Sequence, residues 1–461
     1  MSTEGLRAAE EKMRAASVPD AAIATFRHYY SQLVEGESGL LGDDDLGGLE
    51  HVPAYDDLSE SEDREALDRA VVIKLNGGLG TSMGMERAKS LLEVKDGLSF
   101  LDIIVAQVLE LRRRHGARLP LVLMNSFYTR EDTLGALERH EELAADVPLD
   151  FLQNKEPKIR VDDLHPVEWP EEPALEWCPP GHGDVYTALQ TSGMLDALLE
   201  HGYEHAFLSN SDNLGAVLDP RILAWFAAEG LPFCMEVCAK TPADRKGGHP
   251  AVLRETGRLV LRESAQTPEE DQERFADIDR WRFFNTNNLW VSLRALRDVL
   301  DERDGVLGLP MIVNRKTVDP GDDSTPEVFQ IETAMGAAVG VFEGARVLDV
   351  PRRRFAPVKT TSDLLVLRSD AYVLTEEAHV EPAPERDGDL PLVDLDSRYF
   401  KLLREFDARF PAGPPSLVAC DSLTVEGDVR FGRDVVARGA VELRNDGDEQ
   451  LVVDDGAVLE G

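Results

Sequence analysis

The sequence predicts an α/β protein with a mostly parallel sheet, followed by a C-terminal β-helix. The first observation is that short apolar runs alternate with longer helical patterns from Val71 onward. Two of the helical patterns cover Leu101–His115 and Gln330–Glu343, and the apolar runs read VVIKL, LVLM, HAFLS, FCMEV and NLWVSL. Strands that alternate with helices are typical of an α/β domain built on a mostly parallel sheet.

The second observation is a six-residue apolar period that begins after Pro415. Two sets of positions carry it: Leu417, Leu423, Val429, Val435 and Val441, and, two places later, Ala419, Val425, Phe431, Ala437 and Leu443. Hexapeptide repeats are the signature of a β-helix. A few strands of a small sandwich are the alternative, although five consecutive matches favour the β-helix.

These patterns divide the chain into four parts. Residues 1–45 have the pattern of two amphipathic helices. Residues 46–375 hold the α/β pattern, including a hairpin predicted at 251–264. Residues 376–396 are acidic, contain proline and lack a period, so we expect a linker before a β-helix domain at 397–461.

Net charge and composition exclude several classes of partner. The 461 residues carry a formal net charge of −38 at pH 7, so the long-range field repels nucleic acid and anionic membranes. No apolar run approaches the roughly 18 to 20 residues that span a bilayer. The N-terminus shows no apolar signal core, and four scattered cysteines do not make a disulfide framework. We therefore expect a soluble protein of the reducing cytoplasm.

A glycine-rich loop follows the run VVIKL. In NGGLGTSMG, residues 76–84, the glycines let a ligand approach the backbone, whose N–H groups can bind phosphate oxygens. The dinucleotide-binding motif needs a helix that starts inside the glycines, and the Walker motif needs Gly-Lys-Ser/Thr; this loop matches neither. What remains is a long loop closed by Lys89, which suits a triphosphate with the lysine as a point charge. A tight structural turn is an alternative of about equal weight.

The same loop resembles that of the eukaryotic-type UTP–glucose-1-phosphate uridylyltransferases, also called UDP-glucose pyrophosphorylases. Their pattern K-L-N-G-G-L-G-T-S-M-G, followed five residues on by lysine and serine, is present from Lys74 to Ser90. Six further motifs occur in the family's order: FLQNKEPKI (151–159), PPGHGD (179–184), LSNSDNLGA (208–216), KTPADRKGG (240–248), FNTNNLW (284–290) and PVKTTSDLL (357–365). The resemblance covers the chain from Val71 onward.

This resemblance implies a Rossmann-like nucleotidyltransferase domain and a C-terminal left-handed β-helix. It also implies a reversible, Mg²⁺-dependent reaction in which UTP and glucose 1-phosphate give UDP-glucose and pyrophosphate. An in-line attack on the α-phosphorus of UTP needs positioning and charge neutralisation more than a proton shuttle. Lysines, glycines and one acidic metal ligand suit that chemistry.

The resemblance assigns the nucleotide to the glycine loop. Leu75, Asn76, Gly77 and Gly78 would contact the nucleotide, and the two glycines would also lie near the sugar phosphate. Lys89 would hold the leaving β and γ phosphates as a catalytic residue.

Two further motifs supply contacts to the base and to the sugar phosphate. Gln153 would read the uracil, because its amide offers both an acceptor and a donor. Gly181 would pack near the base, and His182 would donate to the sugar phosphate. Taken alone, Gln153 would more often be a surface residue and His182 a loop residue, but their intervals to the other motifs favour the functional roles.

Asp212 is the residue assigned to Mg²⁺. It follows the run HAFLS, and open parallel sheets bind ligands at the carboxyl ends of their strands. Phosphate oxygens and water would fill the other metal positions. An Asx turn formed by Asn210, Asp212 and Asn213 is the alternative; in the functional interpretation, Asn210 and Ser211 lie along the substrates.

Three residues complete the predicted site. Glu263 and Asn287 resemble the family's hexose-hydroxyl ligands, although Glu263 could equally be a solvated charge at a strand end. Lys359 follows a basic cluster at 351–354 and is expected to bridge the phosphates of both substrates as the second catalytic residue.

Two competing functions remain. Pyrophosphorylases for N-acetylhexosamine 1-phosphate tend to carry Thr-Arg after the glycine loop, whereas Thr81-Ser82 favours glucose here. A silent assembly protein that uses the β-helix as an interaction surface is the other, and the joint presence of Lys89, Asp212 and Lys359 argues against it. The six-residue rhythm breaks at 445–448 and the chain is strongly acidic, so we expect a monomer or at most a weak dimer.

Overall fold

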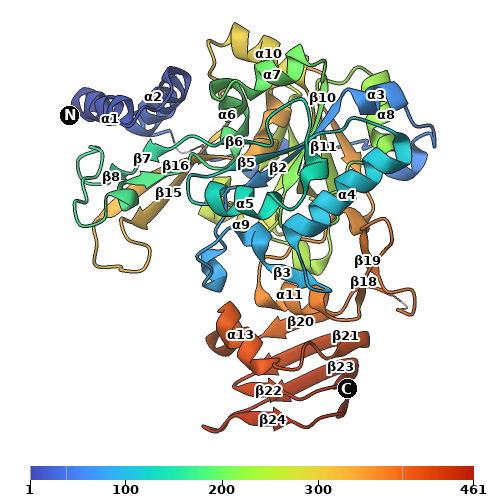
Figure 1. Ribbon diagram of the computed structural model, residues 1–461. Helices are drawn as coiled ribbons and strands as arrows, with labels where there is room; N and C mark the ends of the chain where they lie inside the picture. The colour runs from blue at the N-terminus through green and yellow to red at the C-terminus, as the bar shows by residue number, and fades with distance from the viewer. Residues whose placement is uncertain (1, 38, 387) are drawn as a thin grey trace.

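A seven-stranded sheet forms the centre of the computed structural model, which describes residues 2–37, 39–386 and 388–461 (Figure 1). The strand order is β17-β11-β14-β10-β2-β5-β6. The strands span Ala70–Asn76 (β2), Leu121–Asn125 (β5), Asp150–Leu152 (β6), His205–Asn210 (β10), Phe233–Ala239 (β11), Phe283–Ser292 (β14) and Arg346–Asp349 (β17). Strand β14 runs antiparallel to both neighbours, and the other neighbouring pairs of this sheet are parallel. The predicted α/β architecture with a mostly parallel sheet is confirmed.

Helices cover both faces of this sheet. The helices span Phe100–His115 (α4), Val185–Thr191 (α6), Met194–Glu200 (α7), Pro220–Ala228 (α8) and Leu293–Glu302 (α10). On β2, Val72 packs into the apolar cluster that includes α4 and α8, whereas Val71 and Ile73 pack with α6, α7 and α10. All residues of β2 are buried, as expected for a central parallel strand between two helical layers.

Helix α4 confirms the helix predicted at Leu101–His115. Ser99 caps it, because the Ser99 hydroxyl accepts the Asp102 N–H and the Asp102 carboxylate accepts the Ser99 N–H. At the other end the chain leaves the helix at Gly116, which adopts the left-handed conformation with φ +62°.

The helix predicted at Gln330–Glu343 is wrong. The first residues belong to β16 (Glu327–Thr333), which pairs along its whole length with β15 (Met311–Thr317), and a 3-10 helix, η11, follows from Met335 to Gly340. A Cβ on Gly336 would lie 2.7 Å from Asn285 Nδ2, so this turn is packed closely against β14. The apolar spacing that predicts a helix here combines a paired strand with a tight turn, and the strand pairing decides the conformation.

Two smaller predictions of local structure are confirmed. The first 45 residues contain α1 (Ser2–Ala15) and α2 (Asp20–Glu35), whose apolar sides pack with residues of β15, β16 and β8 (Ile159–Arg160). The hairpin consists of β12 (His249–Leu253) and β13 (Leu259–Arg262), which pair antiparallel. Among the described helices, none has the length and apolar character to cross a membrane.

The C-terminal part consists of parallel strands stacked below the central domain (Figure 1). One sheet contains β20 (Leu392–Leu395), β21 (Ser416–Glu426), β23 (Val436–Arg444) and β25 (Val458–Glu460), and a second contains β22 (Val429–Phe431) and β24 (Leu451–Val453). Leu423 pairs with Val441 and Val425 with Leu443, so this pairing follows the six-residue period. Parallel stacking disagrees with an antiparallel sandwich, and the left-handed β-helix stays a prediction.

The second set of periodic positions deviates at one residue. Ala419 is exposed, and Cys420 takes the interior place with no exposed surface. The register of β21 against β23 shifts twice here, between Ser416 and Ala419 and again between Cys420 and Ser422, which accounts for the displacement. The segment 376–396, for which we expect a linker, contains β19 (Val380–Pro382) and β20, and the domain boundaries stay predictions.

Candidate functional site

The predicted site begins where the parallel strands β2, β5, β6 and β10 end. The glycine loop leaves β2 here and folds back on itself, because the Lys89 N–H donates to the Gly78 carbonyl at 3.0 Å. Gly80 adopts φ +68°, and a Cβ on it would lie 3.0 Å from Met85 Sδ. The fold of the loop thus returns Lys89 to the strand ends, where open α/β sheets bind ligands.

Asn76 and Ser211 fasten the loop to its neighbours with their side chains. Asn76 Nδ2 donates to Asn125 Oδ1 at 2.8 Å and to Thr133 Oγ1 at 2.9 Å. The Ser211 hydroxyl donates to the Leu75 carbonyl at 2.8 Å and also lies 3.3 Å from Asn76 Oδ1. Both side chains are buried and bonded to protein, so they shape the loop on which a nucleotide would lie.

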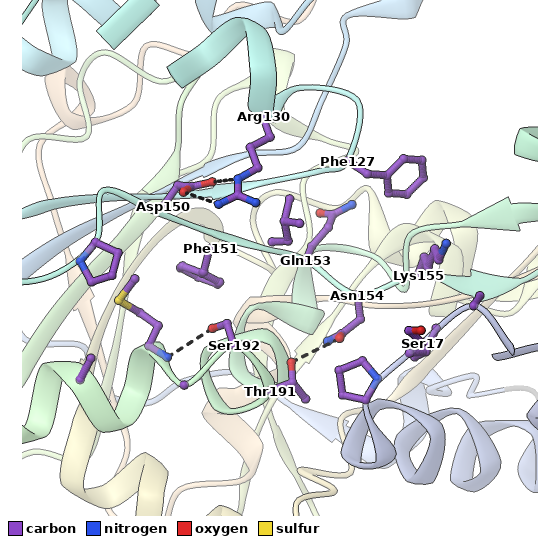
Figure 2. A pocket seen from close by; sticks show the side chains of 18 residues that line it. Ser17, Phe127, Arg130, Asp150, Phe151, Gln153, Asn154, Lys155, Thr191 and Ser192 are labelled. Carbon is purple, nitrogen blue, oxygen red and sulfur yellow. Dashed lines mark hydrogen bonds and ion pairs between the residues drawn. The ribbon is translucent and has the colours of Figure 1, made fainter. Parts of the chain in front are cut away.

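Gln153 follows β6 and lies against the same loop. A Cβ on Gly77 would come within 2.7 Å of Gln153 Oε1, whereas the corresponding side of Gly78 is open space. Gln153 also lines a cavity of about 670 Å³ beside the turn between α1 and α2. Figure 2 shows the Gln153 side chain in the wall of this cavity, near Asn154 and Lys155 and below Phe127. The glycine at position 77 therefore leaves room for the amide expected to read the base.

Asp184 fixes the segment that follows Gln153. Its Oδ2 accepts the Asn154 N–H at 2.6 Å, and its Oδ1 accepts Asn154 Nδ2 at 2.9 Å. The Thr191 hydroxyl, drawn with Asn154 in Figure 2, donates to Asn154 Oδ1 at 3.3 Å. Burial raises the pKa of Asp184 to about 7. Asp184 is the last residue of the PPGHGD motif, and its contacts join that motif to Gln153; sequence analysis does not single it out.

Gly181 and His182 lie beside the end of β16. Gly181 adopts φ +79°, and a Cβ on it would lie 2.6 Å from the Thr333 carbonyl, so no side chain fits there. His182 Nδ1 accepts the Met335 N–H at 3.0 Å. Burial, aided by the charge of Lys359, lowers the pKa of His182 to about 4, so the ring is neutral near pH 7. Its proton then lies on Nε2, which is a donor for an anionic substrate.

Asp212 binds two lysines through one carboxylate oxygen. Lys89 Nζ and Lys359 Nζ each lie 2.8 Å from Asp212 Oδ2. Asp212 Oδ1 is buried and forms no hydrogen bond with any residue that the structure describes. Burial alone would raise the pKa of Asp212, but the two ammonium groups outweigh this effect and hold the pKa below its usual value. Asp212 is therefore ionised and keeps one oxygen for a further positive ligand.

Asn213 holds the loop that carries Lys359, and sequence analysis does not assign it this task. Its Oδ1 accepts the Ala356 N–H at 2.8 Å, and its Nδ2 donates to the Arg354 carbonyl at 3.2 Å. The Val358 N–H donates to the Asp212 carbonyl at 3.1 Å. These contacts place Lys359 beside Asp212 although most of its side chain is exposed.

The basic cluster at 351–354 is largely consumed by ion pairs. Arg354 and Glu236 form a buried pair in which Nη2–Oε1 is 2.6 Å and Nε–Oε2 is 2.8 Å. Glu236 also accepts Trp290 Nε1 at 2.9 Å. Arg352 pairs with Asp244 at 2.7 Å. Both arginines therefore anchor the loop before Lys359, and their bidentate pairs leave them little capacity for phosphate.

Lys74, inside the buried strand β2, is a third residue whose role the sequence does not identify. Its Nζ donates to Ser209 Oγ at 2.8 Å and to the Ala216 carbonyl at 2.6 Å. Burial lowers its pKa to about 7, and the charge of Arg354 adds to this effect. A lysine within the apolar run VVIKL is the signal that marks it, because such a residue needs buried partners.

The two residues expected to bind hexose hydroxyls, Asn287 and Glu263, are connected to each other through contacts of Asn285 and Gly248. Asn287 adopts φ +58°, which is unusual for a residue other than glycine, where β14 shifts register against β11. Asn285 Nδ2 donates to Asn287 Oδ1 at 2.8 Å, and the Asn285 N–H donates to the Gly248 carbonyl at 2.8 Å. The carboxylate of Glu263 packs on Gly248, where a Cβ would lie 2.2 Å from Oε2. On its other side Asn285 lies against η11, whose Met335 contacts His182.

A metal cluster made only of protein side chains is absent from the described residues, since no three His, Cys, Asp or Glu groups gather for one. Asp212, with its free and buried Oδ1, fits an ion that takes most ligands from phosphate and water. Mg²⁺ has this habit.

Comparisons with known proteins agree with the motifs. A family model described as UTP--glucose-1-phosphate uridylyltransferase matches residues 23–438. The chain is 42% identical over 417 residues to the UTP--glucose-1-phosphate uridylyltransferase of Hordeum vulgare, with 89% of this chain and 86% of the relative covered. It is 41% identical over 415 residues to a probable enzyme of the same name from Schizosaccharomyces pombe, with 89% of this chain and 80% of the relative covered.

Solved structures give the same match over nearly the whole chain. The UDP-glucose pyrophosphorylase from Leishmania major, solved in open and closed forms, superimposes with a TM-score of 0.94 at 45% identity and covers 99% of this chain and 98% of its own. The UDP-glucose phosphorylase from Trypanosoma brucei superimposes with a TM-score of 0.93 at 44% identity, with the same coverage.

Proposed function

Since the chain belongs to the UTP–glucose-1-phosphate uridylyltransferase family, we propose that Lys89, Asp212 and Lys359 form the centre of its active site. The chain is a nucleotidyltransferase that makes UDP-glucose and pyrophosphate from UTP and glucose 1-phosphate. The observation that supports this centre is the convergence of two ammonium groups on one carboxylate at the strand ends.

The two lysines neutralise the charge that moves during transfer. A phosphate oxygen of glucose 1-phosphate attacks the α-phosphorus of UTP in line, and pyrophosphate leaves. Lys89, at the closing end of the glycine loop, holds the leaving β and γ phosphates. Lys359, on the opposite loop, bridges the phosphates of both substrates. Fixed positive charges placed before the reaction stabilise the transition state without reorganisation.

The nucleoside and the hexose lie on opposite sides of this centre. Leu75, Asn76, Gly77 and Gly78 contact the nucleotide through the loop backbone, Gln153 reads the uracil, and Gly181 packs near it. His182 donates its Nε2–H to the sugar phosphate, for which the Nδ1 contact with Met335 fixes the tautomer. Asn210 and Ser211 line the substrates, and Glu263 and Asn287 bind hexose hydroxyls.

Mg²⁺ is the proposed cofactor, and Asp212 is the residue that would hold it. When bound, the ion would supply positive charge to the phosphates. Asp212 Oδ1 is the free oxygen for this purpose, while Oδ2 stays with the two lysines. Removal of divalent ions by a chelator should abolish pyrophosphate release, and added Mg²⁺ should restore it.

We propose that the protein has four parts: a helical segment at 1–45, a catalytic domain at 46–375, a linker at 376–396 and a left-handed β-helix at 397–461. The four cysteines are free and buried, which suits a reducing cytoplasm. Neither nucleic acid nor membrane is expected as a partner, and the active form is a monomer or a weak dimer.

A substrate panel tests the sugar specificity. Purified protein with UTP and Mg²⁺ should release pyrophosphate with a higher kcat/KM for glucose 1-phosphate than for N-acetylglucosamine 1-phosphate. The motivation is Thr81-Ser82 in the glycine loop, in place of the Thr-Arg of the acetylated-sugar enzymes. Equal or reversed preference would contradict the proposal, and the Lys359→Ala variant is the control for contaminating activity.

A further inference from the structure

Lys240 has a buried charge to which no described residue forms a hydrogen bond. It follows β11 directly, and its N–H donates to the Arg282 carbonyl at 2.7 Å, which fixes the start of its side chain. Its Nζ is buried and forms no hydrogen bond with any described residue. The ammonium lies over the ring of Phe275, 5.2 Å from Nζ to the centroid. An ammonium group in this situation needs a compensating negative charge nearby.

Two carboxylates, Asp244 and Glu263, act electrostatically on Lys240, and one of them is already paired. Asp244 accepts Arg352 at 2.7 and 3.0 Å through its two oxygens and also accepts the Thr241 hydroxyl at 2.6 Å. Its charge is therefore neutralised by Arg352. The carboxylate of Glu263 is the other, and Lys240 is the one cation of the described residues that acts on it.

The remaining neighbours add no negative charge. His249, on β12, stacks on Trp281 with ring centroids 4.3 Å apart and on Phe275 with centroids 4.7 Å apart. Burial, followed by the charges of Lys240, Arg262 and Arg280, lowers the pKa of His249 to about 2, so this ring is neutral. Arg262 is occupied by Asp43 at 3.0 Å. Glu263 is thus the carboxylate acting on Lys240 that no other described cation neutralises.

The Glu263 carboxylate packs directly on the backbone at Gly248. Gly248 lies so close that a Cβ there would meet Glu263 Oε2 at 2.2 Å. The Glu263 N–H donates to Gln266 Oε1 at 3.1 Å, which fixes the turn after β13. Lys240 and Glu263 are not in direct contact, because no ion pair joins them among the described residues. The buried ammonium of Lys240 therefore acts on the Glu263 carboxylate through its positive charge at a distance, not through a hydrogen bond.

We infer that Lys240 is a positioning residue of the hexose subsite, which keeps the Glu263 carboxylate ionised so that it accepts hydrogen bonds from hexose hydroxyls. The inference rests on the proposed role of Glu263 and adds to it a partner that sets its charge. Because Lys240 Nζ is buried, Lys240 does not itself touch the sugar.

The charge relation has a pH signature. Burial raises the pKa of Glu263, and the charge of Lys240 lowers it in the opposite direction. Without the ammonium, the pKa of Glu263 rises further, and the carboxyl takes up a proton at a higher pH. As the pH is lowered, a variant without this ammonium therefore loses affinity for glucose 1-phosphate at a higher pH than the wild type does. Its affinity for UTP is not affected.

The test measures KM for each substrate between pH 5.5 and 8 in Lys240→Met, Lys240→Arg, Glu263→Gln and the Lys240→Met/Glu263→Gln double variant. We expect Lys240→Met to raise KM for glucose 1-phosphate about tenfold near pH 6, because charge-assisted hydrogen bonds to the sugar weaken. The rise of KM on acidification should begin at a higher pH in this variant than in the wild type. KM for UTP should stay the same. Lys240→Arg should restore most of the affinity, and Lys240→Met should add nothing in the Glu263→Gln background.

The outcomes separate the inference from the proposed function. An unchanged KM for glucose 1-phosphate in Glu263→Gln would refute the role of Glu263 itself, and the inference with it. A raised KM in Glu263→Gln, together with a wild-type pH profile in Lys240→Met, would overturn the inference alone. If Lys240→Met does not fold, recovery of folding by Glu263→Gln supports the inference, and failure to recover overturns it.

Discussion

Lys359 Nζ lies 2.8 Å from Asp212 Oδ2, although 147 residues separate the two in the sequence. Lys89 reaches the same oxygen from the other side. One carboxylate thus holds the glycine loop and the loop after β17 at a fixed separation. Substrate phosphates that enter between them meet charges that are already in place.

Loss of either member of this pair should slow the reaction strongly. Lys359→Ala and Asp212→Asn should each lower kcat by about 10²- to 10³-fold or more, the usual cost of removing one group that stabilises transition-state charge. Lys359 is mostly exposed, so its truncation should leave the thermal midpoint nearly unchanged. Steady-state kinetics and thermal denaturation measure both effects. Near-normal turnover of Lys359→Ala would show that another lysine performs this role.

Asn213 should matter through the loop that it holds. Asn213→Ala leaves the part-buried Ala356 N–H without its partner, and an unsatisfied group of this kind costs about 1–3 kcal/mol. The Arg354 carbonyl loses one of its two side-chain donors and keeps Asn288 Nδ2 at 3.2 Å. We expect a lower free energy of unfolding and a lower kcat, because Lys359 loses its fixed location. Urea unfolding and kinetics on the same preparation test this. Asn314→Ala on β15 is the matched control and should change neither; an Asn213→Ala enzyme with full kcat would argue against the positioning role.

His249 should make the protein less stable in acid. Burial, with nearby cations, lowers its folded pKa to about 2, whereas in the unfolded chain it titrates at its ordinary value of 6.5. Below pH 6.5 the unfolded chain binds a proton that the folded chain does not bind, so stability falls as the pH drops. Between pH 7 and 5 the loss is about 2 kcal/mol from this group. His249→Phe removes it, and phenylalanine fits the stack between Trp281 and Phe275.

The comparison of urea unfolding at pH 7 and pH 5 isolates this effect. The difference in unfolding free energy between His249→Phe and the wild type should move in favour of the variant as the pH falls. A difference that stays constant would mean that His249 is not the titrating group.

The assembly state should follow from charge. Leu451, Val452 and Val458 are 40%, 51% and 51% exposed at the end of the C-terminal sheets, but three such side chains supply far less area than the roughly 1,200 Å² of a stable interface. The net charge of −38 adds repulsion between identical subunits. We expect a monomer or weak dimer at moderate salt, fully active, with more dimer as salt screens the repulsion. Light scattering after size exclusion measures this, and an octamer that persists at low protein concentration would refute it.

Local pattern was sufficient for elements whose signal is continuous along the chain. The five apolar runs form strands, and the capped, periodic segment around α4 forms a helix. The segment after Gln330 was mispredicted because its conformation depends on pairing with β15, which lies outside any local window. The displacement of Ala419 by Cys420 likewise depends on the register between two strands.

In the candidate site, too, some residues are marked by local sequence pattern and others depend on distant partners. Lys89 and Asp212 follow glycine and strand signals that are visible in the sequence. Asp184 and Asn213 act through partners that are distant in the chain, Asn154 and Ala356, so no spacing rule identifies them. The basic cluster at 351–354 precedes Lys359 in the sequence, and ion pairs with distant Asp244 and Glu236 make two of its arginines anchors of the loop.

The location of β2 in the middle of the sheet has a consequence for protein synthesis. This strand is the first of the seven to leave the ribosome, and it must wait for β5 on one side and β10 on the other. Lys359 emerges 147 residues after Asp212, which is about 7–30 seconds later at ordinary rates of translation. A nascent chain that has just completed β10 therefore carries Asp212 with Lys89 alone, and the charge set closes only when the last strand, β17, has been added at the far edge of the sheet.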